Sequence, residues 1–337
     1  MRIPTKEQFR GCLLGQCVGD ALGMPVERHS SDVCFKYVQQ LKAGRIGERS
    51  HSNFVFGQYT DDSQLARELI QSYVACRKFC PSDYAVRIAA IYAEKRIVGS
   101  SSATAKVALR LAQGISWLEA GTPPPYARNG SAMRAAPIGL FFYNHPSQLI
   151  QAAYDQGRIT HQDKSSLAGA VAIAGAVALA IQSNYIEHSS FLNQLSTWVR
   201  QIEASVADSL QDLINWVCLP PQVAVKKIAL CGNPPDSLSD WEGISPHVHP
   251  SVLWSLYAFL RTPGDYWETI CTAISVGGDV DTTAAMAGAI SGAYLGEKAV
   301  KPQVAVQLTD QGTWGYSELI SLADRCYQLS MELGLLT

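Results

Sequence analysis

The sequence has no excess of either charge. Its 337 residues carry 27 Lys and Arg against 29 Asp and Glu, a formal net charge of −2. A protein that binds nucleic acid through phosphate contacts needs a strongly basic face, so no nucleic-acid partner is expected. The charge balance gives no indication of binding to an anionic membrane either.

The nine cysteines include no Cys-x-x-Cys pair, and their number is odd. Several lie in apolar stretches that are expected to be helical, Cys12 and Cys271 among them. This pattern does not fit a secreted disulfide framework or a structural zinc site. It fits reduced thiols in a cytoplasmic protein.

A long hydrophobic run is also missing. The longest uncharged apolar run covers residues 167–181 and consists mostly of Ala, Gly and Val. A helix that spans a bilayer needs about 20 apolar residues, so this run is expected to be a buried core helix. The N-terminal segment MRIPTKEQFRG has no apolar signal core. We therefore expect a protein without a membrane span, located in the cytoplasm.

Strand patterns are nearly absent, and helical periodicity prevails. Helices are expected at residues 7–23, 61–78, 83–95, 102–113, 167–182, 191–217, 252–260, 282–295 and 318–333. Turn-rich loops are expected at residues 29–57, 121–130 and 231–250. The last loop is long for a structureless connection, and such loops are often functional. With 47 % apolar residues and no linker or repeat, the chain is predicted to form one all-α domain over residues 1–337.

Four glycines recur at a spacing of four residues, namely Gly11, Gly15, Gly19 and Gly23. This spacing places them on one face of a helix. Each glycine costs about 1 kcal/mol against alanine in a helix interior, so the stripe needs an explanation. Close approach of a second helix is one, and exit of the chain into a loop at residues 24–27 is another for the last glycines.

Two acidic clusters stand at predicted helix starts. They read Tyr-Thr-Asp-Asp-Ser at residues 59–63 and Gly-Gly-Asp-Val-Asp-Thr-Thr at residues 277–283. Each offers two carboxylates and a hydroxyl, the oxygen ligands that hard divalent cations prefer. Four clustered carboxylates would repel one another unless cations lay between them.

Capping is the alternative for both clusters, because Asp and Thr at a helix start usually cap it and interact with its dipole. For residues 60–62 alone we favour capping. For residues 279–282 capping and metal binding are equally supported, because Gly277 and Gly278 indicate a tight turn or a close approach. Both clusters together, on helices packed in one core, favour a metal site.

Other polar residues are ambiguous when taken singly. Glu27 is typical of a solvated surface residue, Asp20 of a structural hydrogen-bond acceptor, and His161 of a structural histidine. The Gly-Ser turns at residues 99–102 and 130–131 offer free backbone N–H groups to an anion such as a diphosphate. Such turns before helices are, however, mostly caps.

Taken in order, these segments resemble the ADP-ribosylglycohydrolase family. That family includes the glycohydrolase that reactivates dinitrogenase reductase and the animal ADP-ribosylhydrolases. The matching segments are GCLLGQCVGDALGMPVE (11–27), YTDDSQLA (59–66), RNGSAMRAAPIGL (128–140), THQDKSSLAGAVAIAGAVALAI (160–181) and AISVGGDVDTTAAMAGAISGAYLG (273–296). Five motifs in the same order are far more specific than any one of them.

The resemblance implies a single compact orthogonal helical bundle with two Mg²⁺ or Mn²⁺ ions at its centre. The implied metal ligands are Thr60, Asp61, Asp62, Asp279, Asp281 and Thr282. The implied catalytic residues are Glu27, which matches a movable glutamate of the family, Asp62 and Asp281. The expected substrate-binding residues are Ser100, Asn129, Gly130, Ser131, Met133 and His161.

The sequence departs from the family pattern at a few positions. It reads Arg-Asn-Gly-Ser at residues 128–131, where many members have Gly-Asn-Gly-Gly, and Val280 replaces a common Thr. An aromatic that some members carry shortly before Asn-Gly corresponds here to the stretch 125–127, Pro-Tyr-Ala. These differences leave the implied metal ligands in place and fall where substrate preference is set.

The resemblance implies hydrolysis at C1″ of the distal ribose, with release of ADP-ribose from a modified side chain. Arginine is expected as the acceptor ahead of serine. The expected partners are an ADP-ribosylated protein and ADP-ribose, and the chain is expected to be a monomer. The alternatives are a non-catalytic protein that binds ADP-ribose or resembles a crystallin, a hydrolase of another ADP-ribose conjugate, and a nucleotide phosphohydrolase. The presence of all six implied ligands favours activity.

Overall fold

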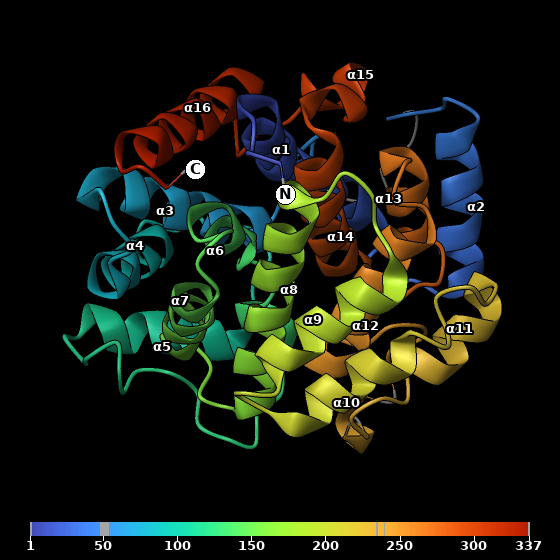
Figure 1. Ribbon diagram of the computed structural model, residues 1–337, viewed down its shortest axis with the longest axis horizontal. Coiled ribbons are helices and arrows are strands. Elements are labelled where there is room, and N and C mark those ends of the chain that lie inside the picture. Colours follow the sequence, from blue (N-terminus) through green and yellow to red (C-terminus); the bar gives the residue numbers. More distant parts are fainter. Residues whose placement is uncertain (1, 48–53, 234, 239, 336–337) are drawn as a thin grey trace.

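The structure is a computed structural model that describes residues 2–47, 54–233, 235–238 and 240–335. Within these ranges the chain forms sixteen α-helices and short 3₁₀ turns, with no β-strand (Figure 1). Extended pairing is limited there to isolated bridges, such as the one between Gln58 and Thr309. The prediction of an all-α bundle is confirmed.

The helices, in chain order, are α1 (Lys6–Gly23), α2 (Ser31–Lys42), α3 (Asp61–Cys76), α4 (Pro81–Ala93), α5 (Ser102–Ala112), α6 (Ala136–Phe141), α7 (Pro146–Arg158), α8 (Lys164–Gln182), α9 (His188–Val199), α10 (Ala204–Leu213), α11 (Pro221–Ile228), α12 (Val248–Arg261), α13 (Tyr266–Ile274), α14 (Val280–Leu295), α15 (Pro302–Ala305) and α16 (Tyr316–Glu332).

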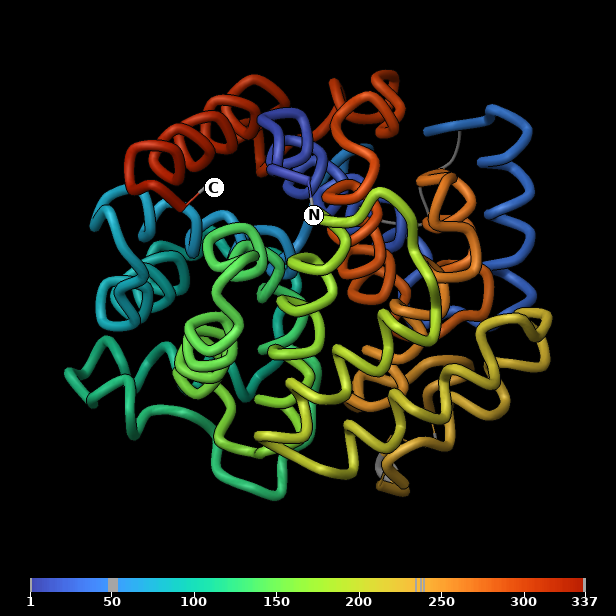
Figure 2. The backbone as a smooth tube through the Cα atoms, viewed as in Figure 1, coloured from blue at the N-terminus to red at the C-terminus, as the bar shows by residue number. Residues whose placement is uncertain are grey.

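Helices α1 and α14 touch through their backbones. A Cβ atom on Gly15 would lie 2.3 Å from the carbonyl oxygen of Gly288. One on Gly19 would lie 2.1 Å from the carbonyl oxygen of Ala284, and Gly11 makes the same kind of contact. In Figure 2 the blue tube of α1 runs beside the red-orange tube of α14. The predicted close approach of a second helix is confirmed, and it explains why this helix carries glycines.

Helix α8 is a second central helix, rich in alanine and buried on every side. It packs against α6, α7, α9, α12 and α14. It is the one helix within the described residues that is long and apolar enough to cross a membrane, and 83 % of its apolar window is buried inside the protein. This burial matches the prediction of a core helix at residues 167–181.

The predicted loop at residues 29–57 is partly wrong, because it contains helix α2. The buried residues of α2 are Cys34, Tyr37, Val38 and Leu41, whose helical spacing places them on one face of the helix. Helix α2 packs against α13. Residues 48–53 of the predicted loop lie outside the described residues.

The predicted single helix at residues 191–217 is also wrong. The chain forms α9 and α10 instead, separated at residues 200–203. Glu203 caps α10, since its side chain accepts a hydrogen bond from the backbone N–H of Ser205. This break lets α10 fold back against α9, which one continuous helix could not do.

Several further helices were not predicted, and four of them share a feature. Helices α6, α7, α11 and α15 carry a proline in their first turn, as Pro146 and Pro221 illustrate. Proline is well tolerated there, because the first N–H groups of a helix have no intrahelical acceptor. A proline that marks a turn in the sequence therefore marks a helix start here.

All nine cysteines lie within the described residues, and all are free thiols. Five of them are buried in the helical core.

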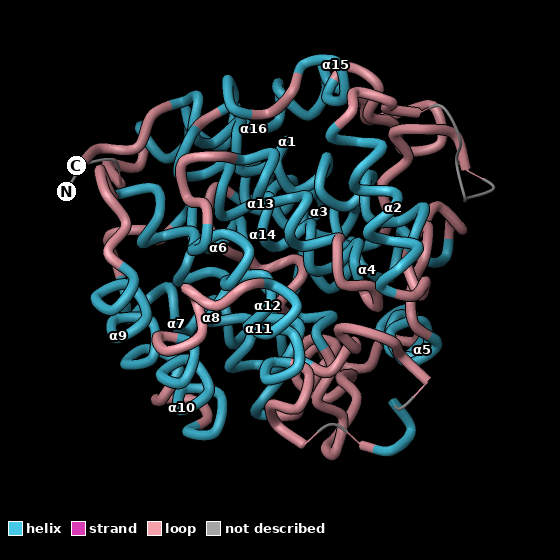
Figure 3. Tube along the Cα trace, turned by 90° about the vertical axis from the view of Figure 1, so that its right-hand side faces the viewer, coloured by secondary structure: helices cyan, strands magenta, loops and turns pink. Residues whose placement is uncertain are grey.

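The first turns of α3 and α14 carry the two acidic clusters, at Asp61–Asp62 and Asp279–Asp281. Figure 3 shows a group of loops beside α5, on one side of the molecule. The loop after α5 and the loop before α12 both contribute residues to the cavity into which the two clusters project.

Candidate active site and metal centre

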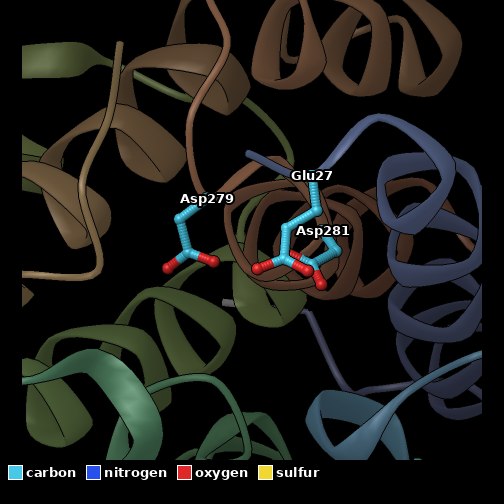
Figure 4. A group of neighbouring side chains, drawn as sticks. All are labelled: Glu27, Asp279 and Asp281. Carbon is cyan, nitrogen blue, oxygen red and sulfur yellow. The ribbon is translucent and has the colours of Figure 1, made fainter. Parts of the chain in front are cut away.

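The structure brings the two acidic clusters together in one cavity of about 780 Å³. Asp61 and Asp62 come from α3, and Asp279 and Asp281 from the start of α14. Glu27, which follows the short 3₁₀ turn after α1, completes the group. Oxygens of Glu27, Asp279 and Asp281 lie within 4.8 Å of one another, and Figure 4 shows their carboxylates directed toward the same side.

Two glycines place Asp279. Gly277 and Gly278 have φ values of +80° and +93°, which favour glycine strongly. A Cβ atom on Gly278 would lie 2.1 Å from the carbonyl oxygen of Ile244. The backbone N–H of Arg28 donates to the carbonyl of Gly278 at 2.8 Å, which ties the segment of Glu27 to α14. The expected tight turn and the expected close approach are therefore both present.

Asp20 holds the first turn of α3. Its carboxylate accepts hydrogen bonds from the backbone N–H groups of Thr60 and Ser63 at 3.0 and 3.1 Å. The Thr60 hydroxyl lies 2.9 Å from an oxygen of Asp20 and 3.0 Å from one of Asp62, and it makes no capping hydrogen bond. Asp20 is the structural acceptor that the sequence predicted. Thr60 occupies the N-cap position, but its hydroxyl faces carboxylates.

Burial and mutual repulsion disfavour ionisation of this group. Burial, with the charge of Asp20 next, raises the pKa of Asp61 to about 8. Burial, with the charge of Asp279 next, raises the pKa of Glu27 to about 7. The pKa values of Asp62 and Asp281 lie well above the usual range for the same reasons. Positive charge placed among these carboxylates would remove the repulsion.

The donor set fits divalent cations. Oδ1 of Asp62 is buried and has no hydrogen-bond partner in the described part of the chain, although buried carboxylate oxygens normally have one. Its neighbours offer carboxylate and hydroxyl oxygens, the ligands of Mg²⁺ and Mn²⁺. A buried carboxylate oxygen without a hydrogen-bond partner, among other oxygen donors, fits the role of a metal ligand.

Asn129 connects the substrate loop to the acidic centre. Its side-chain amide donates to Asp279 at 2.5 Å and to the Ser251 hydroxyl at 2.7 Å. Gly130 lies against the ring of His161, since a Cβ atom there would be 2.9 Å from Cε1. The loop thus forms a wall of the cavity beside the acidic centre.

Five of the six expected substrate-binding residues line the cavity, and the sixth does not. Those that line it are Ser100, Asn129, Gly130, Met133 and His161. The side chain of Ser131 is fully buried, and its hydroxyl donates to the carbonyl of Ser166 at 2.8 Å. In the 3₁₀ turn Asn129–Ser131 the asparagine faces the acidic centre, whereas the serine faces α8.

Sequence reasoning missed two cation–aromatic pairs at this cavity. The guanidinium of Arg28 lies 4.3 Å from the ring centroid of Trp241, and that of Arg128 lies 5.8 Å from the ring centroid of Tyr126. All four residues line the cavity. Trp241 belongs to the long loop at residues 231–250, whose length was the only signal that pointed to it.

Fold and site together define an all-α protein with a buried acidic centre at two helix N-termini. A model of the ADP-ribosylglycohydrolase family matches residues 1–334. The chain belongs to this family, as its motifs indicated.

Relatives are similar over nearly their whole length. ADP-ribosylhydrolase ARH3 of Gallus gallus is 31 % identical, with 97 % of this chain and 94 % of that protein covered. ARH3 of Homo sapiens is 30 % identical, with 96 % and 93 % covered. An uncharacterized protein of Archaeoglobus fulgidus is 31 % identical, with 98 % and 100 % covered. A solved structure described as an ADP-ribosylglycohydrolase-related protein complex has a TM-score of 0.70 at 26 % identity and covers 97 % of this chain and 99 % of its own.

Proposed function

We propose that this protein hydrolyses the glycosidic bond between ADP-ribose and a modified protein side chain, with release of ADP-ribose. The observation that carries the proposal is the meeting of the two acidic clusters and Glu27 in one cavity, walled by the loop of Asn129 and Gly130. Membership of a glycohydrolase family supports hydrolysis of an ADP-ribose conjugate. The ARH3 relatives, which are named as ADP-ribosylhydrolases, support it further.

We assign two Mg²⁺ or Mn²⁺ ions to the acidic centre. The residues that would hold them are Thr60, Asp61, Asp62, Asp279, Asp281 and Thr282, all of which line the cavity. When bound, such ions supply Lewis acidity that activates water and orients substrate hydroxyls. They would also offset the repulsion that, after burial, raises the pKa values of Asp61, Asp62 and Asp281.

Glu27 is the residue placed to move a proton. Its carboxylate lies within 4.8 Å of ligand oxygens of Asp279 and Asp281, and it comes from a separate loop. Burial is the main cause that raises the pKa of Glu27, and it favours the protonated form that can give a proton to a leaving atom. Once ionised, the same group can take a proton from attacking water. Cleavage at C1″ passes through a cationic, oxocarbenium-like centre. Asp62 and Asp281 line the cavity in which this centre would form.

Other cavity residues would bind and orient the ADP-ribosyl group. Arg28 and Arg128 offer cationic N–H donors, which suit a diphosphate. Asn129 donates its amide hydrogens to Asp279 and to Ser251, so its side chain orients the carboxylate of Asp279. Glycine at position 130 leaves room for the ring of His161, because a Cβ atom there would lie 2.9 Å from Cε1 and 3.1 Å from Nε2.

For the acceptor we keep arginine ahead of serine. A protonated guanidinium leaves as a neutral, resonance-stabilised base, so it needs little help from an acid. A serine alkoxide needs full protonation as it leaves, which places a larger demand on Glu27. Both linkages are compatible with the same attack on C1″.

The test uses purified protein with Mg²⁺ or Mn²⁺ and two mono-ADP-ribosylated peptides, one linked through arginine and one through serine. We expect release of ADP-ribose, lost in EDTA and in Asp281→Asn, and faster from the arginine-linked peptide. Asp208→Asn, at an exposed carboxylate outside the cavity, is the matched control and should keep full activity. Release of AMP would show a phosphohydrolase, and binding of ADP-ribose without release would show a non-catalytic protein. Either result would refute the proposal.

A further inference from the structure

Arg134 is a fully buried arginine, and within the described residues it has no anionic partner. Its hydrogen-bond acceptors there are all neutral, its Nη1 has none, and its guanidinium lies 5.6 Å from the ring centroid of Tyr84. Nε donates to the side-chain oxygen of Gln156 at 3.0 Å, and Nη2 donates to the carbonyl of Gln156 at 3.0 Å and to the hydroxyl of Thr160 at 2.8 Å. An unpaired buried charge is expensive, so its retention at this place calls for an explanation.

The chain of hydrogen bonds continues from Arg134 to the cavity. The oxygen of the Thr160 hydroxyl lies 2.8 Å from Nδ1 of His161, and Thr160 is itself buried. His161 lines the cavity, and Gly130 lies against its Cε1–Nε2 edge. A buried guanidinium is therefore connected to the substrate cavity through one hydroxyl and one imidazole.

Donor counting fixes the direction of these bonds. A guanidinium can only donate, so the Thr160 oxygen accepts from Arg134 and its single proton remains to be placed. Within the described residues, Nδ1 of His161 is the one acceptor found for that proton. If Nδ1 carried a proton instead, the buried hydroxyl would donate to nothing, which costs about the same as a lost hydrogen bond. The proton of the imidazole therefore belongs on Nε2.

The imidazole is also neutral. Burial, followed by the charges of Arg134 and Arg128, lowers the pKa of His161 to about 3. A neutral imidazole has one N–H, so the tautomer decides whether the ring donates to the cavity or accepts from it. ADP-ribose presents mostly acceptor oxygens in its diphosphate, so a donor at Nε2 matches it.

We infer that Arg134 and Thr160 are positioning residues that hold His161 in its Nε2–H tautomer, so that the ring donates to an oxygen of the ADP-ribosyl group. This inference rests on the proposed function only for the identity of the ligand. We call the hydrogen-bonded series Arg134–Thr160–His161 the relay. The relay explains why Arg134 has no carboxylate partner, because a carboxylate beside Arg134 would compete with Nδ1 of His161 for the proton of the Thr160 hydroxyl.

The first arm of the test reads the tautomer in ligand-free protein by ¹⁵N NMR of labelled histidine, with His161→Gln for assignment. We expect the proton on Nε2 in the wild type and a mixture of tautomers in Thr160→Val. Arg134→Met should also raise the Nδ1–H population, because the Thr160 hydroxyl, no longer held by the guanidinium, can turn its proton away from Nδ1. A wild-type proton on Nδ1, or an unchanged tautomer in Thr160→Val, would overturn the inference.

The second arm measures ADP-ribose binding by calorimetry and kcat against KM for the peptide. Thr160→Val should weaken ADP-ribose about five- to tenfold, the effect of a lost donor hydrogen bond, and raise KM more than it lowers kcat. Thr160→Ser keeps the hydroxyl and should restore both the tautomer and the affinity. Thr269→Val removes a buried hydroxyl of α13 outside the cavity and should change neither. Unchanged affinity in a Thr160→Val protein that has lost the Nε2–H tautomer would refute the donor role.

The two arms separate this inference from the hydrolase proposal. The tautomer is read without substrate, so a wild type that fails to release ADP-ribose refutes only the hydrolase. A wild type that hydrolyses the peptide while its His161 carries the proton on Nδ1 refutes only the relay.

Discussion

Without divalent cations, the protein should lose stability as the pH rises from 7 to 8. In the folded protein the pKa of Asp61 is about 8, and those of Asp62 and Asp281 lie well above the usual range. In the unfolded chain all three are ionised at pH 7, since an unperturbed Asp has a pKa of about 3.9. The folded state then binds more protons than the unfolded state. Under that condition the free energy of unfolding falls with rising pH.

The choice of pH window follows from the histidines. Burial lowers the pKa of His161 to about 3 and that of His247 to about 4. Below a pH of about 6.5 the unfolded chain binds protons at these positions, so the histidines make stability rise with pH there. Above pH 7 the histidines contribute little. The carboxyl groups then set most of the slope, and the buried cysteines, whose pKa values burial also raises, add to it with the same sign.

The magnitude follows from the linkage relation. Each carboxyl group that is protonated only in the folded state lowers the free energy of unfolding by about 1.4 kcal/mol per pH unit. Asp61 alone, half-titrated near pH 8, accounts for about 1 kcal/mol between pH 7 and 8. With Asp62 and Asp281 the loss reaches about 4 kcal/mol at most, which is several degrees in Tm for a protein of this size.

Thermal unfolding in EDTA at pH 7 and 8, repeated with Mg²⁺, measures this slope. Mg²⁺ binds the ionised carboxylates, so the stabilisation by Mg²⁺ should grow as the pH rises. Asp281→Asn should raise the stability in EDTA and flatten its slope, whereas Asp208→Asn should leave both unchanged. Stability in EDTA that stays level or increases from pH 7 to 8 would refute the reasoning, as would a Tm that does not respond to Mg²⁺.

Two further predictions concern the scaffold. Gly15→Ala should lower the free energy of unfolding, measured in urea, by about 2 kcal/mol. The clash of the new Cβ atom with the carbonyl of Gly288 outweighs a gain in helix propensity of about 1 kcal/mol. Gly264→Ala, at a position with open space around it, should have little effect, and equal losses in the two variants would contradict the contact. Asp310→Asn should cost about 3 kcal/mol in the same assay. It removes the carboxylate 2.6 Å from the buried guanidinium of Arg67 and leaves only Glu68, at 3.2 Å, as an anionic partner. A loss below about 1 kcal/mol would show that this pair is not needed.

The residues of the acidic centre were predictable because each cluster is a local motif at a helix start. Thr60, Asp61 and Asp62 begin α3, and the Gly-Gly turn before Asp279 sets up α14. The meeting of the two clusters depends on the tertiary structure. The residue pattern alone favoured it, and the family resemblance implied it. In the structure both clusters line the same cavity.

The packing partner of the first helix was also readable in the sequence. Ala284, Gly288 and Gly292 recur at a spacing of four, the spacing of the glycines in α1, and their carbonyl groups meet those glycines. Only one of the two stripes was recognised. A pair of matching small-residue stripes predicts which helices pack, whereas one stripe predicts only that some helix does.

The side-chain directions in the loop of residues 128–131 could not be predicted. Asn129 and Ser131 stand two residues apart, yet one faces Asp279 and the other faces the carbonyl of Ser166. A 3₁₀ turn rotates the chain by about 120° per residue, so neighbouring side chains point in different directions, here toward the cavity and toward α8. The hydrogen bonds that join Arg134, Thr160 and His161 could not be predicted either, because they depend on tertiary contacts and not on the spacing of the residues in the sequence.

The measurement that tests the central claim most directly is the fate of the water oxygen. The ADP-ribosylated peptide is hydrolysed in H₂¹⁸O with Mg²⁺, and the released sugar is reduced with borohydride at once to prevent exchange at the anomeric carbon. The account predicts ¹⁸O on C1″ of ADP-ribose and none in phosphate or in the peptide. Label in a phosphate group, or an acceptor side chain that carries the ¹⁸O, would contradict attack at the glycosidic carbon and with it the proposed hydrolase.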